Sequence, residues 1–256
     1  RPATTRDPLI DSVLPDGSRI NIVYGSDVSR KGSNFTIRKF SDSPLSILDL
    51  IKSGTLSYEM AAYVWLMVAG GMNIFVCGET ASGKTTLLNS ISTFINPDGK
   101  VVSIEDTPEL QIPHENWTRE VVRGMAAGES AVSMFDLLRS ALRQRPDEII
   151  IGEIRGEEGS VVFQAMQTGH PCMATFHAST VEKLIQRLTG QPINIPKPYI
   201  DNLNLVILMS AVRLPDGRTA RRVTSISEII GYDSPSDSFR YIEVFRWDPV
   251  TDTFEF

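Results

Sequence analysis

The segment GETASGKTT, residues 78–86, combines glycines, a lysine and hydroxyl side chains in a spacing that suits phosphate binding. Glycines let a loop fold closely around an anion, so that successive backbone N–H groups point inward. In this pattern Lys84 is expected to reach the β- and γ-phosphates of ATP, and the hydroxyl of Thr85 to bind Mg²⁺. The full candidate cofactor-binding set is Gly78, Glu79, Thr80, Ala81, Ser82, Gly83, Lys84, Thr85 and Thr86.

The flanking residues give this loop the context that the motif requires. An apolar run at 74–77 precedes it, and residues 86–94 can continue as a helix. A strand, a glycine-rich loop and a helix in that order form the phosphate-binding unit of P-loop proteins. A chance match to the loop pattern is expected in about one chain in a hundred of this length. We therefore predict that the chain binds ATP or ADP together with Mg²⁺.

Acidic residues follow two other apolar runs. Glu105 comes directly after Val101–Ile104, and Glu153 comes shortly after Glu148–Ile151. The carboxyl ends of strands meet at the ligand-binding edge of an open α/β sheet, so both acids are expected to face the phosphate loop. One can hold Mg²⁺, and another can orient or deprotonate the attacking water. The pattern predicts nucleotide hydrolysis; the alternative is a pair of solvated carboxylates at strand ends.

Two histidines lie on either side of a short apolar run, Cys172–Phe176. His177 ends that run and is expected at the same edge of the sheet, where it can sense the γ-phosphate by a hydrogen bond. With a single cysteine between them, His170 and His177 are a weak signal for zinc. His114, in a polar loop, is expected to be structural.

The arrangement of apolar runs indicates the elements that must position these side chains. Beyond Asn73, short apolar runs separated by segments with helical spacing predict a mainly parallel sheet that is buried on both faces. After Gly190 the pattern becomes extended, with strands expected at 203–214, 222–230 and 239–246.

The N-terminal part has a different pattern. Residues 9–14 and 20–24 predict a hairpin around a Pro-Asp-Gly turn, and Phe35–Ile37 predicts a third strand. A polar segment at 41–44 is expected to be a linker. The fold class is therefore α/β with a second, smaller part, and the predicted domains are 1–44 and 45–256.

The composition argues against several classes of protein. The net charge of −6 argues mildly against a nucleic-acid binder, and two cysteines cannot form a disulfide framework or a four-cysteine zinc site. The most apolar stretch, Ala61–Cys77, is too short and too interrupted for a membrane span. The chain opens on Arg1-Pro2 without a methionine, and we expect a fragment of a longer protein.

Four ordered motifs together resemble those of the secretion and type IV pilus assembly ATPases, the traffic-ATPase family within the RecA-like P-loop proteins. The motifs are the phosphate loop at 78–86, an "Asp box" VVSIEDTPEL at 101–110, a Walker B segment RPDEIIIGEIRGEE at 145–158 and a "His box" GHPCMATFHAST at 169–180. This resemblance implies a RecA-like core. It also implies that residues 1–44 are the C-terminal part and linker of an N-terminal mixed α+β, PAS-like domain.

The resemblance also assigns roles within a Mg²⁺-dependent ATPase site. It implies that Glu105 activates water, that Glu153 lies on the Mg²⁺ side with Thr85, and that His177 lies near the γ-phosphate. Arg19 in PDGSRI and Arg38 in FTIRKF match arginines that this family directs at the γ-phosphate. For these two, the alternative is a pair of solvent-facing arginines on edge strands.

Further arginines surround the two acidic motifs, namely Arg119, Arg123, Arg139, Arg143, Arg145 and Arg155. They can be surface ion pairs of little energetic consequence. In ring-forming ATPases some such arginines contact a neighbouring subunit or its nucleotide. Arg155, two residues after Glu153, is the strongest candidate for a catalytic arginine.

The function implied is an ATP-driven motor of a type IV pilus, an archaellum or a type II-like secretion system. Such a motor would be a homohexamer that acts on a polytopic membrane platform protein, and it would be cytoplasmic, at the inner face of the cell membrane. The chain lacks the four-cysteine subdomain of bacterial type II secretion and pilus-extension members, and segments such as HENW at 114–117 resemble archaeal members.

Two other functions are compatible with a RecA-like core. A nucleic-acid translocase or packaging motor would need a basic channel, which the net charge does not support, so no direct nucleic-acid partner is expected. A scaffold that binds ATP without turnover is disfavoured because Glu105 and Glu153 are both present.

Overall fold

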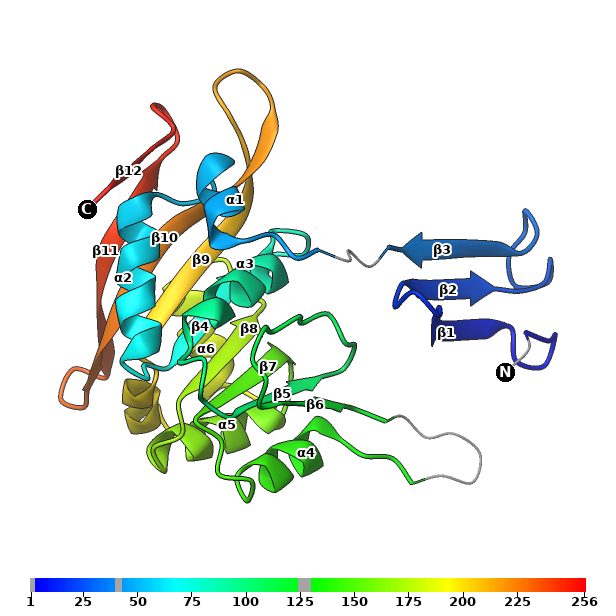
Figure 1. Ribbon diagram of the computed structural model, residues 1–256, viewed down its shortest axis with the longest axis horizontal. Coiled ribbons are helices and arrows are strands. Elements are labelled where there is room, and N and C mark those ends of the chain that lie inside the picture. The colour runs from blue at the N-terminus through cyan, green and yellow to red at the C-terminus, as the bar shows by residue number, and fades with distance from the viewer. Residues whose placement is uncertain (1–2, 40–42, 124–129) are drawn as a thin grey trace. The chain divides into compact units, whose positions relative to one another are not determined.

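The computed structural model describes residues 3–39, 43–123 and 130–256. The chain divides into two compact units, Arg1–Pro44 and Leu45–Phe256. Figure 1 shows the elements of each unit. Residues 41 and 42 of the predicted linker lie outside the described part.

The first unit contains a three-stranded antiparallel sheet in the order β1-β2-β3. Its strands are β1 (Leu9–Val13), β2 (Arg19–Val23) and β3 (Asn34–Arg38). The predicted turn closes the first hairpin, because the N–H of Gly17 donates to the carbonyl oxygen of Leu14 at 2.9 Å. The expected hairpin and third strand are confirmed.

The second unit is built on a nine-stranded sheet in the order β12-β11-β10-β9-β4-β8-β7-β5-β6. Its strands are β4 (Ile74–Gly78), β5 (Val101–Glu105), β6 (Trp117–Val121), β7 (Glu148–Ile154), β8 (Cys172–Phe176), β9 (Leu205–Arg213), β10 (Thr219–Asp233), β11 (Ser238–Asp248) and β12 (Thr253–Glu255). The six strands from β9 to β6 run parallel, and β10, β11 and β12 extend the sheet antiparallel. The predicted mainly parallel sheet is confirmed.

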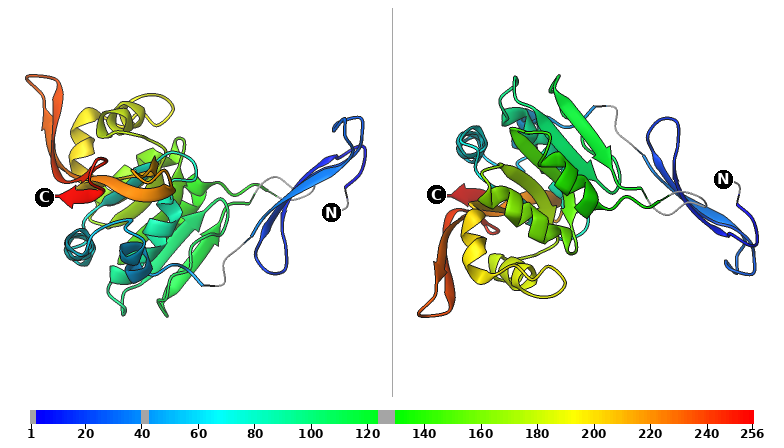
Figure 2. Two further views of the ribbon diagram at one scale, coloured as in Figure 1. Left: turned by 90° about the horizontal axis from the view of Figure 1, so that it is seen from above. Right: turned by 90° about the horizontal axis from the view of Figure 1, so that it is seen from below.

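Helices cover both faces of this sheet, as Figure 2 shows from two sides. They are α1 (Ile47–Lys52), α2 (Tyr58–Ala69), α3 (Lys84–Ile91), α4 (Met134–Ala141), α5 (Glu158–Gln167) and α6 (Val181–Thr189), with short 3-10 helices η1 (Ser92–Phe94) and η2 (Lys197–Asn202). No helix in the described ranges has both the length and the apolar character needed to cross a lipid bilayer.

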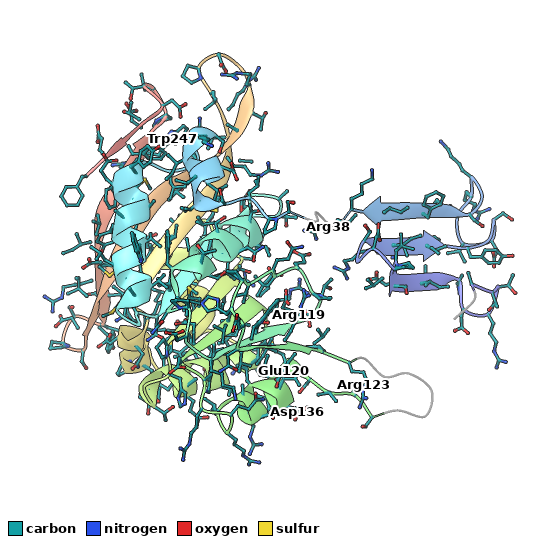
Figure 3. All side chains as sticks on the ribbon, viewed as in Figure 1. Arg38, Arg119, Glu120, Arg123, Asp136 and Trp247 are labelled. Carbon is teal, nitrogen blue, oxygen red and sulfur yellow. The ribbon has the colours of Figure 1, made fainter. Side chains whose placement is uncertain are left out.

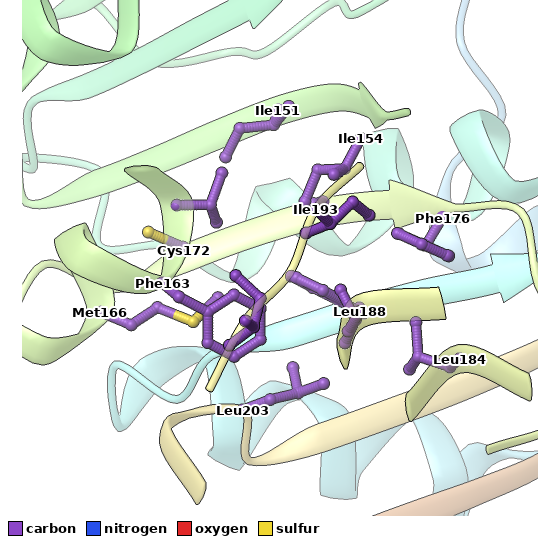
Figure 4. Close-up of a cluster of buried hydrophobic side chains, with 14 of the residues drawn as sticks. Ile151, Ile154, Phe163, Met166, Cys172, Phe176, Leu184, Leu188, Ile193 and Leu203 are labelled. Carbon is purple, nitrogen blue, oxygen red and sulfur yellow. The ribbon is translucent and has the colours of Figure 1, made fainter. Parts of the chain in front are cut away.

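Two hydrophobic cores result, because alternate residues of each strand point to opposite faces. On one face Phe75 and Phe176 stack with ring centroids 6.3 Å apart, and α4, α5 and α6 pack there. Figure 4 shows part of this cluster, including Phe163 and Leu188. On the other face α1, α2 and α3 pack over residues such as Val76. The strands of the central sheet are thereby fixed, and with them the positions of their carboxyl ends.

Candidate active site

Four adjacent parallel strands end at one edge of the sheet, and each carries one of the predicted motifs. The strand order β4-β8-β7-β5 places the phosphate loop after Gly78 next to His177, then Glu153, then Glu105. The ends of β5 and β7 are in close contact, because a Cβ atom added at Gly152 would lie 3.3 Å from Cγ of Glu105. Residues that are far apart in the chain therefore lie along one edge.

The phosphate loop is closely packed against β9. A Cβ atom at Gly78 would lie 2.3 Å from the carbonyl oxygen of Met209, so this position accepts only glycine without rearrangement. The loop then turns through left-handed backbone at Ala81 (φ 63°) and Gly83 (φ 98°). Gly83 is the N-cap of α3, where no side chain caps the helix. The first N–H groups of α3 are therefore left for an anion, which the helix dipole also favours.

Lys84 lies within the loop that it is predicted to serve. Its Nζ donates to the carbonyl oxygens of Gly78 and Glu79, both at 2.9 Å. Partial burial lowers the pKa of Lys84, and the charge of Glu153 partly opposes this shift. The hydroxyl of Ser82 is buried without a hydrogen-bond partner among the described atoms. A bent loop, an uncapped helix start and an ammonium group held on loop carbonyls fit the phosphates of a nucleotide.

Glu105 has 1% of its surface exposed, and described groups of its own unit surround its carboxylate. Oε1 accepts the backbone N–H groups of Glu109 and Leu110 at 2.7 and 2.8 Å. Oε2 accepts Nε–H of Arg119 at 3.1 Å. In this structure Glu105 holds the turn that follows β5. Its predicted role in activating water stays a prediction, and it requires these partners to be exchanged.

Glu153 is half-buried and is bound by Arg155. Nε and Nη2 of Arg155 donate to Oε2 of Glu153 at 2.8 and 2.5 Å, and Nη1 lies 3.2 Å from Oδ2 of Asp106. The hydrogen bonds that Arg155 donates to Glu153 raise the pKa of Arg155. Mg²⁺ is commonly held by one or two carboxylates, a hydroxyl and substrate phosphates, and Glu153 and Thr85 offer such ligands.

The histidines differ in their surroundings. His177 is exposed at the end of β8, and its carbonyl oxygen accepts a hydrogen bond from Arg187. His170 lies at the start of that strand, at the opposite edge, where its Nδ1 is 3.1 Å from Oγ1 of Thr168. His114 is buried, with Nε2 3.2 Å from the carbonyl oxygen of Ile95. A zinc site at His170 and His177 is not formed, and the described residues contain no group of three metal-binding side chains.

The arginines that surround the motifs do not act as one group. Arg119 and Arg155 pair with motif acids, whereas the guanidinium of Arg139 lies over the ring of Phe135. Figure 3 labels Arg119 on β6, Arg123 beyond the end of that strand and Arg38 on β3.

The register of the first unit brings Arg19 and Arg38 together. They are direct cross-strand partners in β2 and β3, so both side chains lie on the same face of this sheet. Nη2 of Arg19 also lies 3.4 Å from Oδ2 of Asp11. The two units are described separately, so the approach of these arginines to a nucleotide stays a prediction.

One contact to the phosphate loop was not anticipated from the sequence. Nε of Arg221, on β10, donates to the carbonyl oxygen of Ala81 at 3.0 Å, across 140 residues of chain. No motif marks Arg221. Arg221 lies one residue before the strand expected at 222–230, so no sequence signal singled it out.

A family model described as "Type II/IV secretion system protein" matches residues 3–214. The chain belongs to this family. The predicted resemblance to secretion and pilus traffic ATPases is thereby confirmed.

Two relatives illustrate the range of the family. A protein designated MJ0900 from Methanocaldococcus jannaschii is 55% identical over 252 residues, which are 98% of this chain and 46% of that protein. Protein VirB11 of Agrobacterium fabrum is 32% identical over 200 residues, which are 68% of this chain and 58% of VirB11. The chain thus spans about half the length of these relatives. The higher identity to MJ0900 agrees with the expected likeness to archaeal members.

Solved structures of this family show the same fold. The VirB11 ATPase from the Brucella suis type IV secretion system superposes with a TM-score of 0.57 at 24% identity, covering 87% of this chain and 74% of that one. The pilus retraction motor PilT with bound ADP superposes with a TM-score of 0.62 at 21% identity, covering 89% and 64%. The predicted α/β class with a RecA-like core is confirmed.

Proposed function

We propose that the chain is the ATP-hydrolysing part of a motor that serves a type II/IV secretion system, a type IV pilus or an archaellum. The observation that carries this proposal is the edge formed by β4, β8, β7 and β5. There, a phosphate loop, a histidine and two acids converge from four separate motifs.

Each group at this edge has a role that its chemistry supports. The loop N–H groups and Lys84 bind the phosphates, because they present positive charge at an uncapped helix start. Thr85 and Glu153 would hold Mg²⁺, which would supply positive charge to the phosphates of the bound nucleotide. Glu105 orients the attacking water once its present donors are exchanged. His177, exposed at the end of β8, senses the γ-phosphate.

The arginines complete the site in this proposal. Arg19 and Arg38 close over the γ-phosphate from the first unit, since a cross-strand pair of cations on one face is suited to a polyanion. Arg155 is a third catalytic arginine. Its guanidinium donates to Oε2 of Glu153, so Mg²⁺ would share this carboxylate with Arg155.

The assembly is part of the same proposal. PilT is a pilus retraction motor, and the VirB11 of Brucella suis is an ATPase of a type IV secretion system. By analogy we propose a homohexamer at the cytoplasmic side of the membrane, acting on a polytopic platform protein.

Phosphate release from ATP in the presence of Mg²⁺ tests the proposal. The wild-type protein is expected to turn over ATP, and Lys84→Ala to lose at least about tenfold in kcat/KM, because a cation at the transferred phosphate is removed. Equal turnover by both proteins would show that this loop is not the catalytic site. Strong stimulation by DNA, sensitive to salt, would instead favour a nucleic-acid translocase.

A further inference from the structure

Strand β10 carries two consecutive arginines that contact different parts of the second unit. Arg221 turns toward the phosphate loop, where its Nε donates to the carbonyl oxygen of Ala81 at 3.0 Å. Its aliphatic part lies over the start of α3, since a Cβ atom added at Gly83 would be 3.0 Å from Cδ of Arg221. The side chain therefore lies against the loop at two residues with left-handed backbone, Ala81 and Gly83.

These two contacts fall on the residues that give the loop its shape. Ala81 has a φ of 63°, a left-handed conformation that an alanine adopts only where its surroundings enforce it. A hydrogen bond from a charged donor is stronger than one between neutral groups, so Arg221 is well suited to hold that carbonyl oxygen. Gly83, which has no Cβ, leaves room for the aliphatic part of the arginine.

The next residue, Arg222, contacts other segments from the opposite face of β10. Arg222 is only 5% exposed and makes two hydrogen bonds to Asp252, both at 2.8 Å. It also donates to the carbonyl oxygen of Ser53, just after α1, at 3.2 Å. Nε1 of Trp247, labelled in Figure 3, donates to the same carboxylate at 2.8 Å. The backbone that carries Arg221 is thus anchored by an ion pair whose arginine is buried.

We propose that Arg221 is a positioning residue, which holds the phosphate loop in its nucleotide-binding conformation through Ala81. This inference rests on the proposed function and deepens it. Arg221 acts on the nucleotide through the loop, so its loss weakens the binding of ADP and ATP while the sheet stays folded.

A pair of matched substitutions tests the role of the hydrogen bond. Arg221→Met keeps an aliphatic chain over Gly83 but has no donor, whereas Arg221→Gln has an amide nitrogen at the same number of bonds from Cα as Nε. In titrations with a fluorescent ADP analogue, Arg221→Met is expected to raise Kd about tenfold. Arg221→Gln is expected to stay within about threefold of the wild type.

The control lies on the same hairpin. Arg218 pairs with Asp216 and is largely exposed, so Arg218→Met makes the same chemical change away from the loop. It should bind ADP as the wild type does. Thermal unfolding without nucleotide should give similar midpoints for all these proteins. Should Arg221→Met fail to fold, Arg221→Ala is measured in its place against the same expected rise in Kd.

The outcomes separate this inference from the proposed function. Suppose that Lys84→Ala loses ADP binding while Arg221→Met binds ADP like the wild type. The proposed role of Arg221 is then wrong, and the proposed function stands. If Arg221→Gln binds ADP as weakly as Arg221→Met, the role of the hydrogen bond from residue 221 is likewise wrong, and the proposed function stands. If Lys84→Ala itself binds ADP like the wild type, the proposed function is wrong.

Discussion

At the edge formed by the ends of β4, β8, β7 and β5, both predicted catalytic acids are bound by arginines of the same unit. Glu105 pairs with Arg119, and Glu153 pairs with Arg155. The sequence predicted the two acids and their common edge, because apolar runs that end in carboxylates indicate strand ends. It could not predict the pairing, since the positions of Arg119 and Arg155 depend on β6 and on the turn after β7.

Replacement of Arg155 tests the ion pairs at Glu153. Because the guanidinium is 66% exposed, Arg155→Ala is expected to change the free energy of unfolding by at most about 1 kcal/mol. We predict that kcat for ATP falls at least about tenfold while Kd for ADP changes little, because the arginine acts on charge that develops during transfer. Steady-state kinetics and ADP titration measure the two effects.

Arg246→Ala is the control for this change. Arg246 lies on β11, is also largely exposed and pairs with an acid outside the motifs. It should leave both kcat and Kd unaltered. An Arg155→Ala protein with the kcat of the wild type would contradict the assignment of Arg155 to the catalytic site.

At the scale of elements, the register of β2 and β3 decides what the first unit can do. The sequence predicted both strands, and it singled out Arg19 and Arg38 by resemblance. Only the strand register shows that the two are direct partners. Both cations therefore lie on one face of this small sheet, where a single anionic ligand could contact the two of them.

Arg38→Thr tests that interpretation. The substitution removes one of the two facing cations and suits a strand, so the first unit is expected to keep its sheet. Turnover of ATP is nevertheless expected to fall at least about tenfold. Arg30→Thr, in the connection between β2 and β3, is the matched control and should turn over ATP normally. Loss of turnover in both variants would mean that the effect is not specific to the cross-strand pair.

The limits of sequence-based prediction are visible in particular strands. β4, β5, β7 and β8 are buried on both faces and read as continuous apolar runs, so their positions were predicted. β6 has the sequence WTREV and is half-exposed, and no apolar run marks it. β10 extends over Thr219–Asp233, beyond the expected 222–230, because pairing with β9 and β11 lengthens it.

At the scale of the whole molecule, the starts of the central strands differ from the edge that carries the motifs, because a buried acid lies there. Glu148 begins β7 with 3% of its surface exposed, and its Oε1 has no hydrogen-bond partner among the described atoms. Burial raises the pKa of Glu148 well above 4.5, and the pKa of the nearby Cys172 thiol is raised as well. The carboxyl group is therefore neutral in the fold over a range in which the unfolded chain would ionise it.

This burial makes stability depend on pH with a definite sign. The folded state binds the proton more tightly, so the contribution of Glu148 is fully present below about pH 4.5 and is lost as pH rises through the folded pKa. Over that window the slope is at most about 1.4 kcal/mol per pH unit. Glu148→Gln cannot ionise, so its stability relative to the wild type should increase between pH 4.5 and 7.

Urea unfolding at several pH values measures this difference. Glu115→Gln, at an exposed position, is the control and should follow the pH profile of the wild type. If Glu148→Gln follows that profile as well, Glu148 is not buried in its neutral form.

The central claim is that one edge of the sheet both binds and hydrolyses ATP. The most direct measurement is a single-turnover reaction with ATP bound to excess protein, quenched over time and analysed for ADP. The wild type should convert the bound ATP. Glu153→Gln should bind it to a similar extent and convert it at least about a hundredfold more slowly, since the carboxylate proposed to bind Mg²⁺ is lost. Equal rates of conversion in the two proteins would contradict the account.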